Sequence, residues 1–139
     1  MKKLTFIILI TLLTGCKDTV TKEDLPLLNG YWEISEVIFE DGNSKSYKAS
    51  STIDFFKVDG LKGLRKKVQP NIGGSFNTNN DSDILTIYEK NGTFILNYKN
   101  DFTQREEQIL SLTKDSFSVK DQEQTTYIYL RYKPIEFHP

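Results

Sequence analysis

The chain has 139 residues, a formal net charge of −1, and 37% hydrophobic and 27% charged residues. This length suggests one domain, the hydrophobic content excludes a disordered chain, and the charged fraction excludes a protein with many membrane spans. The near-neutral charge gives no reason to expect nucleic acid, and one Cys and one His cannot build an internal disulfide or a Cys/His zinc site. One Ala beside seven Tyr and nine Phe favours strands over a helical bundle.

The first sixteen residues predict a lipoprotein signal peptide. A basic start at residues 2–3 precedes ten almost purely apolar residues, 4–13. A helix of ten residues spans about 15 Å, half of a bilayer core of about 30 Å, so the segment is too short to cross a membrane. The four residues that end at Cys16 (Leu-Thr-Gly-Cys) resemble the bacterial lipobox, whose Cys takes diacylglycerol before cleavage.

We therefore expect residues 1–15 to be removed and the Cys16 sulfur to carry the lipid that holds the protein on the outer membrane. Two or more acyl chains anchor a protein stably, whereas one chain binds marginally. The mature chain would have 124 residues, and the loss of two lysines would change its net charge from −1 to −3. Residues 16–26 show no apolar periodicity and are interpreted as a flexible tether.

The Lys- and Asn-rich, Ala-poor composition resembles that of Bacteroidetes lipoproteins. In that group a Lys followed by acidic residues after the lipidated Cys resembles a surface-export signal, and Lys17-Asp18 matches it only in part. Surface and periplasmic orientations therefore both stay open. Asp18-Thr19-Val20 resembles the short O-glycosylation motif of the same group, but so short a motif is more readily explained by chance.

From Leu27 onward, short strand-like runs alternate with turn signals. Asn91-Gly92 is the strongest of these signals, because both residues tolerate the positive φ of a type I′ hairpin turn. The pattern contains no long helix. The predicted strands cover Tyr31–Glu40, Ser51–Val58, Leu61–Gln69, Gly74–Asn77, Ile84–Lys90, Thr93–Lys99, Arg105–Leu112, Ser116–Lys120 and Thr125–Tyr132.

Eight or nine successive short strands predict an all-β domain, either a sandwich or a barrel. Short connections favour an up-and-down order, which lets the last strand pair with the first and removes both sheet edges. We therefore expect a single antiparallel barrel of about eight strands over residues 27–133, followed by a C-terminal tail at 134–139.

The first strand resembles the start of a bacterial lipocalin-like domain, where a Leu-x-Gly-x-Trp element opens strand one. Leu28, Gly30 and Trp32 match that element. The resemblance implies that a basic residue of the last strand packs across the Trp, and Arg131 is the match by position. Such a pair gains about 0.5–2 kcal/mol of cation–π energy, and Gly30 would let the backbone turn tightly beneath the ring.

No catalytic or metal site is expected. His138, the one histidine, lies beside the C-terminus, where nothing rigid would hold it for catalysis. Glu106 and Glu107 are adjacent, so on a regular strand they point to opposite faces, and we interpret them as solvated surface residues. The polar loop 79–83 begins like a calcium-binding loop but lacks its later Gly and Glu.

One basic cluster, composed of Lys57, Lys62, Arg65, Lys66 and Lys67, is interpreted as a solvated strand face that could dock an acidic partner or lipid headgroups. The function hypothesis is a binding protein for a small apolar or amphipathic ligand. Its alternative is a protein-interaction module with a filled barrel, such as an enzyme inhibitor or envelope-assembly factor, and a hydrolase is a distant third. The aromatics that would line a ligand cavity are Phe55, Phe56, Tyr88, Phe94, Tyr98, Phe117, Tyr127 and Tyr129.

Overall fold

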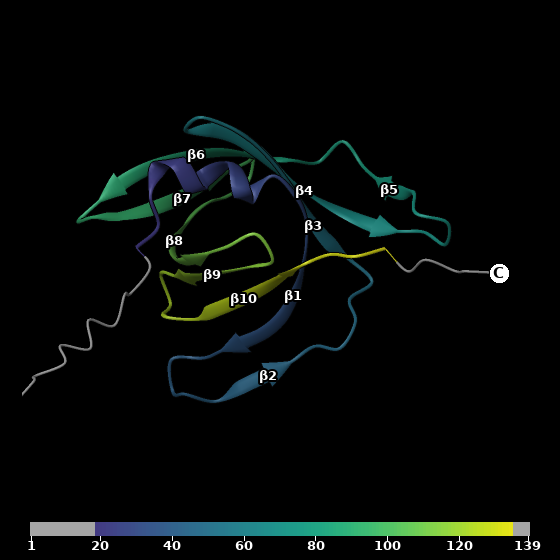
Figure 1. The fold of residues 1–139 in the computed structure, drawn as a ribbon, viewed down its shortest axis with the longest axis horizontal. Coiled ribbons are helices and arrows are strands. Elements are labelled where there is room, and N and C mark those ends of the chain that lie inside the picture. The colour runs from purple at the N-terminus through teal and green to yellow at the C-terminus, as the bar shows by residue number, and fades with distance from the viewer. Residues whose placement is uncertain (1–18, 135–139) are drawn as a thin grey trace, which may run out of the picture.

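Eight antiparallel strands form a closed barrel in the computed structural model, which describes residues 19–134 (Figure 1). A short 3₁₀ helix, η1, precedes the first strand. The elements are η1 (Lys22–Leu28), β1 (Gly30–Ile38), β2 (Ser44–Ser46), β3 (Ile53–Asp59), β4 (Lys62–Pro70), β5 (Phe76–Thr78), β6 (Asp83–Lys90), β7 (Thr93–Lys99), β8 (Gln104–Leu112), β9 (Ser116–Asp121) and β10 (Thr126–Arg131).

The barrel order is β1, β3, β4, β6, β7, β8, β9 and β10, and β10 pairs with β1 to close it. Every pairing is antiparallel, so the predicted all-β, up-and-down barrel of about eight strands is confirmed. The predicted hairpin turn is present between β6 and β7, where φ is 53° at Asn91 and 76° at Gly92. Two short strands lie outside this circuit: β2 pairs with the end of β1, and β5 pairs with the end of β4.

The N-terminal approach to the barrel differs from the expected tether, because residues 22–26 belong to η1. Asp24 caps this helix by accepting a hydrogen bond from the Thr21 backbone N–H at 2.9 Å. Leu25 and Leu28 are 1% and 0% exposed and belong to the core, so η1 packs against β3 and β8 through these two side chains. The signal peptide, Cys16 and His138 lie outside the described residues.

The antiparallel register separates two ends of the barrel. The closed end carries η1 and the turns β3–β4, β6–β7 and β8–β9, while the open end carries the loops that contain β2 and β5 and the turns β7–β8 and β9–β10. Figure 1 shows β2 beside β1 and β5 near the end of β4, both at the margin of the barrel. Within residues 19–134, no helix has the length and apolar character needed to cross a membrane.

The core at the closed end is aromatic and tightly packed. Phe117 stacks on Tyr129 with ring centroids 4.6 Å apart and meets the edges of Trp32 and Phe56 at 4.7 and 5.7 Å. Edge-to-face and offset contacts of this kind suit the charge distribution of aromatic rings. The half of the barrel at the closed end is therefore filled by side chains, and any space for a ligand lies toward the open end.

Candidate functional site

The first and last barrel strands meet at Trp32 and Arg131, which are cross-strand partners. The Arg131 guanidinium carbon lies 3.8 Å from the centroid of the Trp32 ring. Trp32 is fully buried, and its Nε1 donates a hydrogen bond of 2.8 Å to the Leu28 carbonyl at the end of η1. The ring therefore connects η1, β1 and β10 at the closed end.

Arg131 also fixes the turn between η1 and β1. Its Nη1 and Nη2 donate to the carbonyls of Asn29 and Leu27 at 2.6 and 2.7 Å, and its Nε donates to the carbonyl of Lys114 at 3.0 Å. Gly30 has a φ of +118°, and a Cβ there would lie 2.7 Å from Arg131 Nη1. Both the backbone angle and the close approach of the guanidinium require glycine at this position.

The eight aromatics expected around a cavity fall into three groups. Phe55 lies on the outer face against Tyr31, and Tyr88 lies on the outer face with its hydroxyl donating to Glu106 at 2.7 Å. Tyr127 is partly buried against the core and donates a hydrogen bond to Asp121. The remaining five are buried in the core: Phe56, Phe94, Tyr98, Phe117 and Tyr129.

Next to the aromatic core, and sharing Tyr98 and Tyr129 with it, the barrel interior holds a group of buried polar side chains. We call it the inner polar cluster and define it by one residue from each of five strands. Each of the five is at most 7% exposed, and they influence one another electrostatically. The members are Asp54 on β3, Arg65 on β4, Tyr98 on β7, Glu107 on β8 and Tyr129 on β10.

Most hydrogen-bonding capacity of the inner polar cluster is unused within the part of the chain that the structure describes. The hydroxyls of Tyr98 and Tyr129 make no hydrogen bond. The Glu107 carboxylate also accepts none, and the nearest cation to it is Arg65, whose Nη1 lies 3.8 Å from Glu107 Oε1. Asp54 Oδ1 lies 2.8 Å from Lys67 Nζ, without the geometry of a directed hydrogen bond. Among the described residues, Asp54 Oδ1 is the one fully buried side-chain polar atom without a hydrogen bond. Buried polar groups are normally paired, and the Tyr98, Tyr129 and Glu107 oxygens keep some accessible surface through which a ligand could reach them.

Burial also changes the protonation of this cluster. Desolvation raises the pKa of Glu107 to about 7, although the attraction of Arg65 lowers it. Burial raises the pKa of Tyr98 and of Tyr129 well above 10, so both hydroxyls stay neutral and remain able to donate and accept. Perturbed groups that converge inside a barrel are typical of functional sites.

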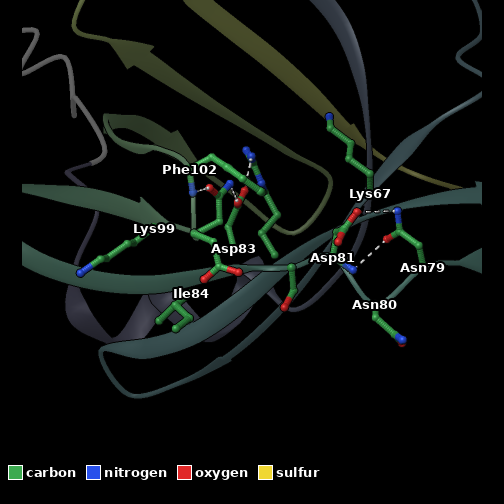
Figure 2. Close-up of a pocket in the computed structure, with 12 residues that line it drawn as sticks. Lys67, Asn79, Asn80, Asp81, Asp83, Ile84, Lys99 and Phe102 are labelled. Carbon is green, nitrogen blue, oxygen red and sulfur yellow. Dashed lines mark hydrogen bonds and ion pairs between the residues drawn. The ribbon is translucent and has the colours of Figure 1, made fainter.

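A pocket of about 650 Å³ opens beside the inner polar cluster at the point where β4 parts from β6. Arg65, Lys67 and Asp83 line its inner side, and the pocket continues round the rim to Ile84 and Lys99. Figure 2 shows Lys67 and the loop from Asn79 to Asp81 on one side, and Lys99 and Phe102 on the other. The pocket thus has a charged inner side, and its otherwise polar rim carries two exposed apolar side chains: Ile84 and Phe102 are 65% and 93% exposed.

Asp83 organises the rim of this pocket. Its Oδ2 accepts a hydrogen bond of 2.7 Å from Arg65 Nη2, and its Oδ1 accepts one of 2.9 Å from Asn100. Asn100 Oδ1 in turn accepts hydrogen bonds from the backbone N–H groups of Phe102 and Thr103, each 2.8 Å long. The buried guanidinium and the loop that carries Phe102 are therefore held by one carboxylate.

The interpretation of Glu106 and Glu107 as solvated residues is wrong for Glu107. The two do point to opposite faces: Glu106 bonds Tyr88 on the outside, while Glu107 lies inside the barrel and is 6% exposed. The basic cluster is likewise divided, because Arg65 and Lys67 face the interior and the pocket. Between residues 19 and 134, no three acidic, Cys or His side chains are grouped to hold a metal ion.

A solved structure described as a lipocalin-like protein from Bacteroides uniformis superposes on this chain with a TM-score of 0.50 and 16% sequence identity. The match covers 76% of this chain and 99% of that one. The fold is a lipocalin-like barrel. No family model matches the chain, and no curated protein matches it.

Proposed function

We propose that this protein is a lipoprotein, held on the outer membrane through Cys16, whose lipocalin-like barrel binds a small amphipathic ligand. The observation that carries the proposal is the inner polar cluster: its member Arg65 lines an open pocket, and its other members have oxygens without a hydrogen bond among the described residues. A wholly apolar ligand would leave those groups unpaired, at a cost of about 1–3 kcal/mol each. A ligand with a polar head would pair them, while its apolar part covers Ile84 and Phe102 at the rim.

We propose binding rather than catalysis, and this is supported by the partners of the two buried carboxylates. Asp54 Oδ1 lies 2.8 Å from Lys67 Nζ, and Glu107 lies 3.8 Å from Arg65 Nη1. Each carboxylate therefore faces a cation, as in a recognition site.

The ligand is expected to co-purify with the protein from its native membrane. Mass spectrometry of the denatured protein should release an amphiphile in near-stoichiometric amount. A double variant, Tyr98→Phe with Tyr129→Phe, should lose it, because the variant removes two hydroxyls that face the ligand and keeps both rings. These hydroxyls make no hydrogen bond within the described residues, so the variant should unfold at the same urea concentration as the wild type.

A variant that keeps the same amphiphile in the same amount would contradict the assignment of the inner polar cluster as the ligand site. If no small molecule co-purifies, the result supports the alternative function, a protein-interaction module. The exposed apolar side chains at the open end favour that alternative: Ile72 is 90% exposed in the β4–β5 connection, and Phe102 is 93% exposed.

Replacement of Cys16 by Ala is expected to abolish lipid attachment, because alanine has no sulfur to accept diacylglycerol. In cells fed labelled fatty acid, the wild-type chain should carry label and the variant none, and the variant should migrate as the uncleaved precursor. Thr14→Ala is the matched control, since it keeps a small residue at its position in the Leu-Thr-Gly-Cys motif and should still be labelled. Label on the Cys16→Ala chain would refute the lipid anchor.

A further inference from the structure

The charges buried inside the barrel are unequal. Asp54, Arg65 and Glu107 have side chains only 4%, 7% and 7% exposed, so two carboxylates share this space with one guanidinium. The guanidinium is already engaged, because its Nη2 binds Asp83 at 2.7 Å. Lys67, the other cation, has a side chain 59% exposed and places its Nζ 2.8 Å from Asp54 Oδ1. With Asp83 included, three carboxylates face these two cations, so the interior carries an excess of negative charge when Glu107 is ionised.

The unused hydrogen bonds point in the same direction. The carboxylates of Asp54 and Glu107 accept no hydrogen bond from any described residue, and the hydroxyls of Tyr98 and Tyr129 are also unpaired. Both tyrosines are more than nine-tenths buried. An ammonium group has three donors and no acceptor, so it would satisfy these acceptors. A ligand carboxylate would instead bring a third anion beside two buried ones, which is unfavourable in a medium of low dielectric constant.

We propose that the polar head of the ligand is a protonated amine that binds between Asp54 and Glu107. This rests on the proposed function, since it specifies the ligand of the same site. The apolar tail of the amine extends past Arg65 toward the pocket rim, because the closed end below is filled by packed aromatic rings.

Amine binding is coupled to the charge of Glu107. Its pKa of about 7 means that Glu107 loses its proton near neutral pH, and an alkylamine stays protonated well above that. The affinity for an amine should therefore rise about tenfold from pH 6 to pH 8. The other titratable groups that face Glu107 are Asp54 on β3, Arg65 and Lys67 on β4, Tyr98 on β7, Asp121 on β9, and Tyr127 and Tyr129 on β10.

The test compares three probes with the same eight-carbon chain: octylamine, octanoate and 1-octanol. Each is titrated by calorimetry into the mature chain (residues 16–139) with Cys16→Ser, so that no lipid or detergent competes. At pH 8, octylamine should bind at least tenfold more tightly than the other two. Glu107→Gln and Asp54→Asn should each weaken octylamine binding at least tenfold, and Glu107→Gln should remove the pH dependence.

Glu106→Gln is the matched control, because Glu106 lies next in the chain but on the outer face. This variant should bind octylamine like the wild type. Circular dichroism of each variant shows that the fold is retained. Octanoate binding as tightly as octylamine would overturn the amine proposal and leave the proposed amphiphile function standing. Failure of all three probes, together with no amphiphile in the native extract, would overturn both.

Discussion

Replacement of Trp32 by Ala is expected to lower the free energy of unfolding by about 3–5 kcal/mol, the usual range for a buried large aromatic residue. The ring is completely buried, meets Phe117 edge-on at 4.7 Å, and bonds the Leu28 carbonyl. The variant leaves a cavity at the closed end and removes the surface on which Arg131 lies. Urea denaturation followed by circular dichroism measures the loss.

Trp32→Phe separates the packing of the ring from its polar contacts. Phenylalanine keeps an aromatic face against Phe117 but loses the Nε1 hydrogen bond to Leu28, so its cost should be clearly smaller than that of Trp32→Ala. If Trp32→Ala costs less than about 1 kcal/mol, as an exposed residue would, then this ring does not hold the barrel closed.

Stability is expected to fall by about 3 kcal/mol as the pH rises from 5 to 8. The pKa of Glu107 is about 7 in the folded protein, against an ordinary value of 4.5. Between these values the folded state binds more protons than the unfolded state, so raising the pH favours unfolding. Each pKa unit corresponds to about 1.4 kcal/mol. The penalty is absent below about pH 4.5 and complete above pH 7.

Glu107→Gln should flatten this pH profile and make the protein more stable than the wild type at pH 8, because glutamine never becomes charged. Glu106→Gln changes an outer residue and should keep the wild-type slope. A series of urea denaturation curves at half-unit pH steps distinguishes the two. An unchanged slope in the Glu107→Gln chain would mean that another group causes the pH dependence.

A gain of stability on removing a buried carboxylate would have a functional meaning. Stable folding does not require Glu107 to be charged, since the burial that raises its pKa makes the charged form costly. Sites of binding are where proteins tolerate such a cost. The same Gln variant should therefore be the more stable protein and the weaker amine binder.

The barrel was predictable because local signals agreed along the whole chain. Turn residues such as Asn91-Gly92 separate strand-like runs, and the predicted bounds of β7 coincide with the observed ones. Two elements were not predicted. β2 has three exposed residues and no apolar alternation, and η1 contains Pro26 within seven residues, so neither carries a periodic pattern. Tertiary packing of Leu25 and Leu28, rather than local propensity, fixes η1.

The inner polar cluster was only partly predictable from the sequence. Strand alternation places Asp54 on the same face as Phe56 and Val58, and Glu107 on the same face as Ile109. The sequence signal for a buried polar site was therefore a charged residue, Asp54 or Glu107, at the end of an otherwise apolar strand face. Sequence alone could not bring these residues together, because the five members come from strands that meet only when the barrel closes.

The contacts of Arg131 have a consequence for the order of folding. Its guanidinium bonds the carbonyls of Asn29 and Leu27, which are 102 and 104 residues away along the chain. Contacts between such distant residues form slowly, because a long loop must close first. The closed end of the barrel cannot be completed until the last strand has been synthesised and released. A chain that stops before β10 begins, at Thr126, leaves one side of β1 unpaired and exposes a sheet edge open to aggregation.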